Sequence, residues 1–371
     1  MHVERIELRR VDVPLVRPFT TSFGTQASRD VLLVRVEGDG VDGWGECVAI
    51  QAPVYSSEFT DGAALALERF LAPAVLGADD VTAAGFADLV GWVHGHRMAR
   101  AALEMALLDA EGRRDGVPLA ERLGATTARV PCGVSVGMES TVAEVVEAVD
   151  GYVAEGYRRV KLKVQPGFDH DLLAAVRAAH PDVPLQVDAN TAYTIDDLDR
   201  LVAFDDYGLL LVEQPFDEDR LGDHARLAER ASTPVCLDES ITTAAVCEDA
   251  ITMGATSVVN LKAGRVGGVL AARSLADLCA ERDVPVWCGG MVETGIGRAA
   301  NVALAACPNF SLVGDVSASD RFWARDLVTD PFVMADDGHL DVPTGPGLGV
   351  EVDHAFLDEV TTDRRVLARR S

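Results

Sequence analysis

Short apolar runs that each end in an ionisable residue recur along the middle of the chain at almost constant spacing. The residues that end these runs lie 25, 25, 25 and 24 positions apart: Lys163, Asp188, Glu213, Asp238 and Lys262. About 25 residues is the combined length of a buried parallel strand, a helix and two short connections. The spacing therefore predicts consecutive βα units, each with one ionisable side chain at the carboxyl end of its strand. In a TIM barrel this end carries the active site.

Lysine is almost absent from this sequence, which makes its positions informative. Of the 33 basic residues only three are lysines: Lys161, Lys163 and Lys262. An arginine side chain stays protonated in proteins, whereas a lysine amine can lose its proton and act as a base. We therefore expect the lysines at these strand ends to take part in proton transfer.

The overall composition is that of a globular protein with a strong negative charge. The formal net charge of −26 argues against binding to nucleic acid or to anionic membranes. No signal-like apolar segment and no stretch of about 18 apolar residues is present. The seven cysteines are scattered without a Cys-x-x-Cys pair, so we expect reduced cysteines and a cytoplasmic protein. We further expect a small-molecule carboxylate as substrate and a homo-oligomeric assembly.

The chain divides into three predicted segments. Residues 1–127 contain strand-like runs at 3–13 and 31–36 and a helical pattern at 98–113, and we expect an α+β lobe. Residues 128–320 carry the repeating units of an α/β barrel. Its eight strands are expected at 130–136, 159–163, 185–188, 209–213, 235–238, 257–262, 286–288 and 311–314. Residues 321–371 lose this rhythm and are expected to pack back on the first lobe.

The three carboxylates lie on consecutive predicted strands, between the strands that carry the lysines. Asp188, Glu213 and Asp238 would converge on one wall of the strand-end pocket, where their mutual repulsion favours a bound cation. Hard oxygen ligands suit Mg²⁺, with Mn²⁺ or another divalent cation as the alternative. Lys163 and Lys262 fall on the second and sixth strands, opposite each other in a ring of eight. This arrangement suits removal of a proton alpha to a carboxylate: Mg²⁺ stabilises the enediolate, and a neutral lysine accepts the proton.

Three further features are weaker signals. Lys161 precedes Lys163 by two positions, so both side chains leave the same face of the strand, and the charge of Lys161 favours a neutral Lys163. An ordinary surface lysine is the alternative for Lys161. Arg265 lies in a tight turn after the sixth strand and is expected at the edge of the site. Residues 289–291 would let the backbone approach a ligand closely, although a plain turn is nearly as well supported.

Together these motifs resemble those of the enolase superfamily, in its muconate-lactonizing subgroup, over essentially the whole chain. The motifs of the metal and lysine positions are Lys161-Leu162-Lys163, Asp188-Ala189-Asn190, Glu213-Gln214-Pro215, Asp238-Glu239-Ser240 and Asn260-Leu261-Lys262. Within the subgroup, other segments are most similar to those of o-succinylbenzoate synthases that also racemise N-acylamino acids. These segments are 18–26, 43–47, 55–58, 133–137, 264–268 and 288–295.

The resemblance implies a fold and a set of site residues. The fold is a TIM-type (β/α)7β barrel with an α+β capping domain formed by the N-terminal segment and the C-terminal tail. Asp188, Glu213 and Asp238 would bind Mg²⁺, and the loops around 19–23 and 50–55 would close over the substrate. The implied substrate-binding residues are Phe19, Phe23, Ile50, Tyr55, Ser135, Asn190, Arg265, Gly289, Gly290 and Met291.

The activity that the resemblance implies is o-succinylbenzoate synthase, a metal-dependent dehydration in menaquinone biosynthesis, together with N-succinylamino acid (N-acylamino acid) racemase activity. In the synthase, Lys163 removes the proton and the enediolate expels hydroxide, while Lys262 stays protonated. In the racemase, the two lysines act from opposite faces of the substrate. A dedicated N-acylamino acid racemase is the close alternative, so the enzyme is a carbon–oxygen lyase, an isomerase or both.

Other classes fit the sequence less well. A dipeptide epimerase or a muconate cycloisomerase would use the same frame, but the loop segments resemble those of the synthases more closely. A Schiff-base aldolase would use a barrel lysine as nucleophile and would need no set of three carboxylates. A non-catalytic structural protein on an enolase-type fold is disfavoured because every expected catalytic group is present.

Overall fold

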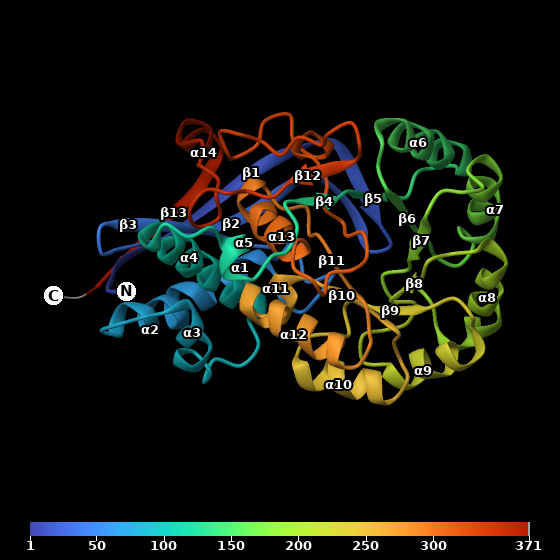
Figure 1. The fold of residues 1–371 in the computed structure, drawn as a ribbon, viewed down its shortest axis with the longest axis horizontal. Helices are drawn as coiled ribbons and strands as arrows, with labels where there is room; N and C mark the ends of the chain where they lie inside the picture. Colours follow the sequence, from blue (N-terminus) through green and yellow to red (C-terminus); the bar gives the residue numbers. More distant parts are fainter. Residues whose placement is uncertain (370–371) are drawn as a thin grey trace.

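The computed structural model describes residues 1–369, which form two main sheets and a set of surrounding helices (Figure 1). The strands are β1 (Val3–Thr21), β2 (Gly24–Gly38), β3 (Val41–Cys47), β4 (Arg129–Pro131), β5 (Gly133–Val136), β6 (Arg159–Lys163), β7 (Leu185–Asp188), β8 (Val212–Glu213), β9 (Val235–Leu237), β10 (Val258–Leu261), β11 (Val286–Cys288), β12 (His339–Asp341) and β13 (Thr361–Ala368).

The helices alternate with these strands over most of the chain. The α-helices are α1 (Thr60–Ala66), α2 (Ala72–Gly77), α3 (Ala83–Leu89), α4 (Arg97–Asp115), α5 (Leu119–Arg122), α6 (Val142–Glu155), α7 (His170–Ala179), α8 (Leu198–Val202), α9 (Leu221–Arg230), α10 (Ala244–Thr252), α11 (Ala263–Val266), α12 (Val269–Glu281), α13 (Gly295–Ala305) and α14 (His354–Val360). Short 3-10 or π turns are η1 (Leu67–Leu71), η2 (Ile195–Asp197), η3 (Ala203–Tyr207) and η4 (Ser319–Arg321).

The first lobe is an antiparallel sheet with the strand order β13-β1-β2-β3, covered by α4. Two glycines of β3 allow the close approach of this helix. A Cβ atom at Gly43 would lie 2.2 Å from the backbone nitrogen of Ala110, and one at Gly45 would lie 2.0 Å from the carbonyl oxygen of Ala102. Because real Cβ atoms do not approach other atoms so closely, any larger residue would push α4 away from the sheet.

The C-terminal part of the chain contacts this lobe at two places. Strand β13 pairs antiparallel with β1, so that Arg5 lies opposite Ala368. The glycine-rich segment before α14 reaches α4, where the backbone N–H of Leu348 donates to Asp109 Oδ1 at 2.7 Å. Both contacts join the C-terminal part of the chain to the first lobe.

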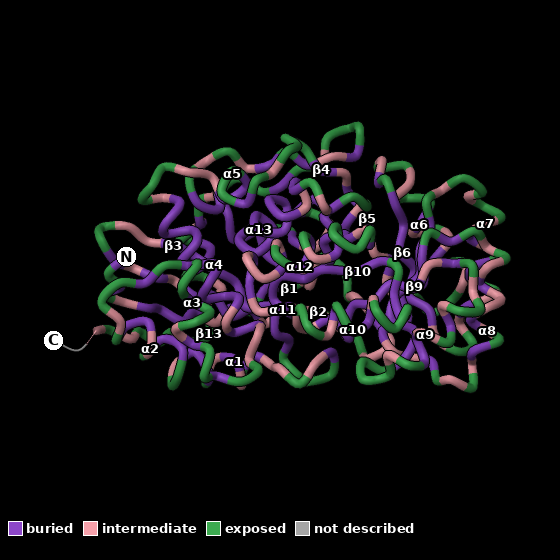
Figure 2. Tube along the Cα trace, turned by 60° about the horizontal axis from the view of Figure 1, so that its bottom comes forward, coloured by how far each residue is buried: buried purple, intermediate pink, exposed green. Residues whose placement is uncertain are grey.

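The second sheet is parallel, and its strands follow the chain in the order β5-β6-β7-β8-β9-β10-β11. All five residues of β6 and all four of β7 are buried. Helices α6 to α10 lie along the outer side of the curved sheet (Figure 1). In Figure 2, which colours each residue by burial, the strands of this sheet are mostly buried. Helix α6 begins at a capping box, in which Thr141 and Glu144 bond each other's backbone N–H groups.

The predicted barrel strands match this sheet closely, apart from three main differences. The expected strand at 130–136 is split, because β4 pairs with β12 in a separate two-stranded sheet and only β5 joins the parallel sheet. Strand β8 is restricted to Val212 and Glu213, although 209–213 was expected. The expected eighth strand at 311–314 makes only single parallel bridges, which pair Phe310 with Val286 and Gly314 with Cys132. A side chain explains the missing ladder, because Arg159 donates to the carbonyl oxygen of Val313 at 3.0 Å and so occupies an acceptor that a strand would use.

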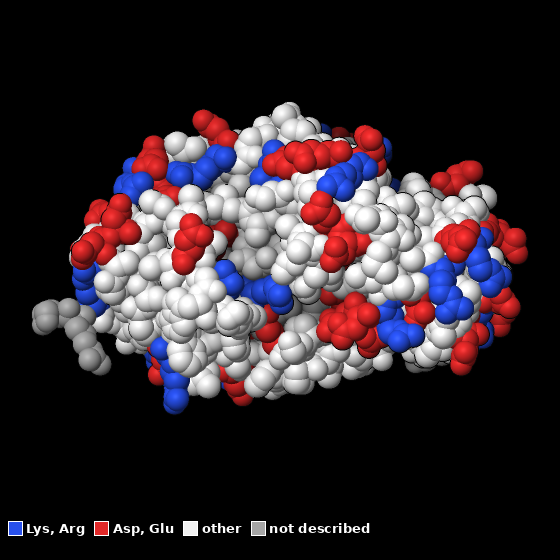
Figure 3. Space-filling view, turned by 90° about the horizontal axis from the view of Figure 1, so that it is seen from below, with Lys and Arg blue, Asp and Glu red and all other residues white. Residues whose placement is uncertain are grey.

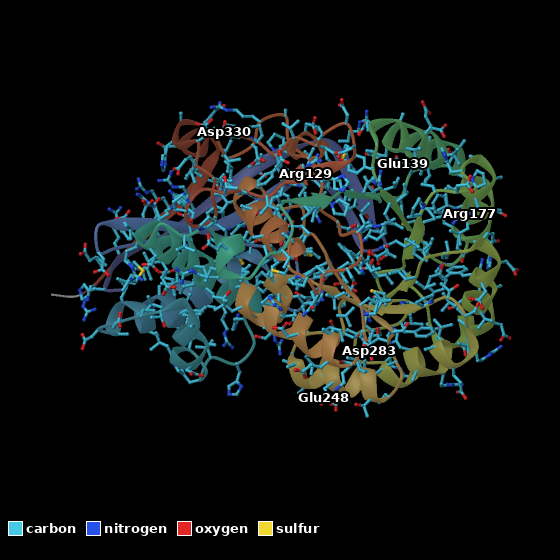
Figure 4. All side chains as sticks on the ribbon, viewed as in Figure 1. Arg129, Glu139, Arg177, Glu248, Asp283 and Asp330 are labelled. Carbon is cyan, nitrogen blue, oxygen red and sulfur yellow. The ribbon has the colours of Figure 1, made fainter. Side chains whose placement is uncertain are left out.

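Charged side chains lie in separate groups on the face shown in Figure 3, with uncharged surface between them. Acidic and basic side chains are mixed on the face shown in Figure 3, with no continuous basic area. Glu248 on α10 lies at the outer edge of the molecule (Figure 4). Arg177 on α7 is half-buried and donates to the carbonyl oxygens of Tyr207 and Val183, each at 2.9 Å. Within the described part of the chain, every helix is too short or too polar to traverse a lipid bilayer.

Candidate active site

The ionisable residues singled out by their spacing lie together at the carboxyl ends of the parallel strands. The register places Lys163 opposite Asp188, and Asp188 opposite Glu213, on adjacent strands. Asp238 directly follows β9, and Lys262 directly follows β10. Because parallel strands in register end at the same edge of a sheet, the regular spacing in sequence becomes a row of charged groups in space.

Each carboxylate of this row contacts a lysine amine. Lys163 Nζ lies 2.6 Å from Asp188 Oδ2, Lys161 Nζ lies 3.0 Å from Glu213 Oε2, and Lys262 Nζ lies 2.7 Å from Asp238 Oδ2. All six side chains are buried. Isolated charges at this depth would carry a large desolvation cost, so the pairing of opposite charges is what allows the row to exist inside the protein.

The surroundings shift the pKa values of these groups in different directions. Burial alone would lower the pKa of Lys161, but Asp315, Glu213 and Asp188 raise it above its ordinary value. Burial also opposes the charged form of Lys262, whose pKa is nevertheless raised by Tyr55, Glu239 and Glu213. The pKa of Asp188 is lowered because Lys163 and Lys161 outweigh the effect of burial. The site therefore holds Lys161 and Lys262 as cations.

Asp315 and Arg159 belong to this network, although the sequence analysis did not select them. Asp315 Oδ2 lies 2.5 Å from Lys161 Nζ, and Asp315 Oδ1 lies 2.7 Å from Arg159 Nη1. Burial alone would raise the pKa of Asp315, but Lys161 and Arg159 lower it to about 2. One signal in the sequence could have found Asp315, because it follows the apolar run 310–314 just as the other carboxylates follow theirs.

Three predicted substrate-binding residues form hydrogen bonds with the charged groups, and their contact with substrate stays a prediction. Asn190 accepts from Lys163 Nζ at 2.6 Å through Oδ1 and donates to Glu239 through Nδ2. The hydroxyl of Tyr55 lies 3.1 Å from Lys262 Nζ and 3.2 Å from Asp238 Oδ2. Arg265 forms an ion pair with Asp238 and donates to the Tyr55 hydroxyl at 3.2 Å. The loop that carries Tyr55 is thereby tied to the strand ends.

A cavity of about 70 Å³ opens at the same strand ends. Its wall includes Lys161, Lys163, Lys262 and Asp188, together with the predicted residues Phe19, Ser135 and Gly290. Phe19 contacts Phe322 edge to face, with ring centroids 6.2 Å apart. The hydroxyl oxygen of Ser135 is buried and has no hydrogen-bond partner among residues 1–369. Residues far apart in the sequence therefore form one chamber.

The other predicted pocket residues lie outside the wall of this cavity. Phe23 and Ile50 border a separate surface hollow beside the first lobe, and Phe23 contacts the ring of Tyr55 at a centroid distance of 6.1 Å. Gly289 packs against Asn260, where a Cβ atom would lie 2.1 Å from the amide oxygen. Met291 packs against the hydrophobic core. Direct substrate contact by these four residues stays a prediction.

The donor chemistry of the row fits a hard divalent cation. Asp188, Glu213 and Asp238 are almost completely buried. Two nearby buried oxygens, Glu239 Oε2 and Asn260 Oδ1, have no hydrogen-bond donor within the described residues. In residues 1–369, however, no three His, Cys, Asp or Glu side chains gather closely enough to hold an ion jointly. Lysine amines lie between the carboxylates instead, so ion binding requires the lysines to release them.

Comparison with known proteins agrees with this geometry. Residues 5–124 match the mandelate racemase/muconate lactonizing enzyme N-terminal domain, and residues 144–356 match the enolase C-terminal domain-like family. An N-succinylamino acid racemase of Amycolatopsis is 55% identical over 98% of both chains. An o-succinylbenzoate synthase of Geobacillus kaustophilus is 44% identical over 100% of this chain and 98% of the relative.

A solved structure shows the same fold over its full length. The crystal structure of an enolase-superfamily member from Listeria innocua covers 100% of both chains with a TM-score of 0.96 and 37% sequence identity. The match includes both the antiparallel first lobe and the parallel sheet that carries the charged row. The chain therefore belongs to the enolase superfamily and has the two domains of its mandelate racemase and muconate lactonizing enzymes.

Proposed function

We propose that this enzyme is an o-succinylbenzoate synthase that also racemises N-succinylamino acids. The observation that carries the proposal is that Lys163 and Lys262, from the second and sixth strands of the parallel sheet, lie in the wall of one cavity together with Asp188. A substrate in that cavity has an amine available from two different strands. Full-length relatives at 40–55% identity carry the names of both activities.

The two activities share the removal of a proton alpha to a carboxylate. Lys163 accepts this proton as general base. In the synthase, Lys262 stays protonated, as its raised pKa favours, and stabilises the negative charge that develops before hydroxide leaves. In the racemase, Lys262 returns a proton to the opposite face of the same carbon. Lys161, held as a cation by Asp315 and Glu213, supplies fixed positive charge next to the base.

We assign the metal site to Asp188, Glu213 and Asp238, with Mg²⁺ as the expected ion and Mn²⁺ as the alternative. When bound, a divalent cation would neutralise charge on the substrate carboxylate. Asp188 and Asp238 would then exchange their contacts with Lys163 and Lys262 for contacts with the cation. The released amines would be free to face the substrate in the cavity.

We further assign substrate contacts to Phe19, Ser135 and Gly290, which line the cavity beside the lysines. Asn190, Tyr55 and Arg265 are assigned as supports that orient the lysines and Asp238, because their hydrogen bonds go to those groups. The Ser135 hydroxyl has no hydrogen-bond partner in the described part of the chain, so it is suited to bonding a polar atom of the substrate.

The complete domain arrangement is also a proposal. Single bridges link segment 310–314 to both edges of the seven-stranded sheet, which supports closure into a (β/α)7β barrel of residues 128–320. Residues 1–127 and the segment 321–371 would form the capping domain, supported by the pairing of β1 with β13. This division places the chamber between the cap and the barrel.

The test is a paired assay on one preparation, first with Mg²⁺ and then with excess EDTA. One arm follows the formation of o-succinylbenzoate, and the other follows exchange of the alpha proton of an N-succinylamino acid in D₂O by NMR. Both signals should require the metal. Lys163→Ala should lower both rates by about 10²- to 10⁴-fold. Lys163→Arg should be equally inactive, because a guanidinium keeps the charge but cannot accept the proton.

The result also separates the synthase from the closest alternative. Proton exchange without dehydration would make the protein a dedicated racemase, which the 55% identity to the Amycolatopsis racemase favours. Either activity at near wild-type rate in Lys163→Ala would show that another residue is the base. Racemisation that survived Lys262→Ala would contradict the two-base mechanism.

A further inference from the structure

The wall of the cavity at the strand ends contains both lysine and arginine side chains. The lysines in its wall are matched by carboxylates, as described above. Two arginines, Arg298 and Arg321, line the same cavity. Neither forms an ion pair with an acidic side chain of residues 1–369, although the chain contains 59 acidic residues. Unpaired guanidinium groups beside a substrate chamber are candidates for binding an anion.

Arg298 is already occupied by structural hydrogen bonds. Its guanidinium is buried, and it donates to the carbonyl oxygen and the hydroxyl of Ser317 and to the carbonyl oxygen of Glu293 at 2.9 Å. These bonds join the start of α13 to the segment after Asp315. We therefore regard Arg298 as a support for the wall of the cavity.

Arg321 is held differently and keeps unused donors. It lies in η4, and its guanidinium carbon is 4.8 Å from the ring centroids of both Tyr152 and Phe322. One terminal nitrogen donates to the carbonyl oxygen of Ser135 at 3.1 Å. Among residues 1–369 the buried Nε of Arg321 has no acceptor, which is also true of the Nε of Arg298. The two rings orient the planar group, which limits the entropy lost when it binds a ligand.

The acidic residues of the cavity do not supply the missing partner. Asp315 is already paired with Arg159 and Lys161. Glu293 lies near Gly290, where its Oε2 would be 3.4 Å from an added Cβ atom, and it makes no ion pair with Arg321 among the described residues. Within residues 1–369 no carboxylate pairs with Arg321, which leaves its guanidinium available to an external anion.

We propose that Arg321 binds the second, terminal carboxylate of a substrate's succinyl group and so makes the enzyme selective for dicarboxylates. This inference rests on the proposed function. The first carboxylate lies beside the lysines and the carbon that loses its proton. Apolar side chains in the same wall, among them Phe19 and Phe322, would contact the methylene groups between the two charges. A planar guanidinium matches a carboxylate with two parallel hydrogen bonds.

The experiment compares an N-succinylamino acid with its analogue in which the terminal carboxylate is a primary amide. Arg321→Gln should lower kcat/KM of alpha-proton exchange for the succinyl substrate by about 10- to 100-fold, the range of a charge-assisted hydrogen bond. The value for the amide should fall by about threefold at most, because a neutral amide gains little from a cation. Arg321→Lys should recover part of the loss for the succinyl substrate.

Arg325 provides a matched control four positions later. It stacks on Phe356 at 4.4 Å and pairs with Asp353 at 2.7 Å, outside the wall of the cavity. Arg325→Gln should leave kcat/KM for both substrates within about twofold of wild type. An equal loss for both substrates in Arg321→Gln would overturn the inference, since it would reveal only support of the Ser135 strand. No loss for either substrate would overturn it as well.

A binding measurement separates failure of this inference from failure of the proposed function. If the wild type exchanges neither substrate, the racemase part of the proposed function is wrong. Calorimetric titration of o-succinylbenzoate and its side-chain amide into wild type and Arg321→Gln then tests the inference without turnover. A selective loss of affinity for the dicarboxylate would support the assignment of Arg321. Equal affinities in the two proteins would refute it.

Discussion

Asp315→Asn should destabilise the protein by about 3–5 kcal/mol, the usual cost of removing one partner from a buried ion pair. Asp315 is the carboxylate that both Lys161, at 2.5 Å, and Arg159, at 2.7 Å, contact. The exposed fractions of the Lys161 and Arg159 side chains are 3% and 1%, so water cannot take over the lost interaction. Glu213 and Asp188 would still contact Lys161, but Arg159 would lose its only carboxylate among the described residues.

The assay is urea-induced unfolding at neutral pH, followed by far-UV circular dichroism and by tryptophan fluorescence. Fluorescence reports on the site because Lys161 Nζ lies 4.8 Å from the ring centroid of the buried Trp287. Asp337→Asn is the control, because Asp337 contacts Arg129 at 2.7 Å with both side chains at least 40% exposed. Such a surface pair contributes about 0–1 kcal/mol. A loss for Asp315→Asn no larger than that of the control would refute the claim that this carboxylate neutralises the buried cations.

Two further predictions concern pH and packing. Burial lowers the pKa of His224 to about 4. Between pH 6.5 and 4 the unfolded chain therefore binds a proton that the folded chain does not. Because of this difference, the free energy of unfolding falls as the pH falls. From about pH 8 to pH 5, wild type should lose roughly 2 kcal/mol more unfolding free energy than His224→Gln; parallel urea-denaturation profiles would contradict this. Gly289→Ala should cost about 1–3 kcal/mol because its Cβ would lie 2.1 Å from Asn260 Oδ1. Gly151→Ala is the control, because Gly151 lies in α6 with open space around it, and this change should raise the melting temperature slightly. If both alanine variants were destabilised, the cause would be something other than the Asn260 contact.

The spacing of ionisable residues predicted the parallel sheet because each strand is short, apolar and ended by a charge. Strands β6, β7 and β11 have the bounds expected from the sequence. The prediction of a regular strand at 311–314 was wrong, although the apolar pattern of this segment is like that of the other strands. Whether a strand forms a full ladder depends on which groups reach its carbonyl oxygens. Here Arg159, more than 150 positions earlier in the chain, takes the oxygen of Val313, and no local pattern shows this.

The sequence also selected the lysines and carboxylates that lie together. They lie together because the parallel strands pair in register, which brings regularly spaced residues to the same edge of the sheet. The partners of these groups were harder to foresee. Asn190 and Tyr55 were selected as substrate contacts, which stays a prediction, and their hydrogen bonds to Lys163 and Lys262 were not foreseen. Arg321 was not selected, because its contacts with the rings of Tyr152 and Phe322 form only after folding. Long-range contacts of single side chains leave little signal in a periodic pattern.

The pairing of β1 with β13 has a consequence for synthesis on the ribosome. Strand β1 is made among the first residues, but its partner on one side emerges only after the whole parallel sheet. Until then one edge of β1 offers unpaired backbone groups that can bind another nascent chain. The exposed charged residues of β13, such as Arg364 and Arg365, later cover that edge with a polar strand. We therefore expect truncation before β13 to reduce soluble yield more than it disturbs the already formed parallel sheet.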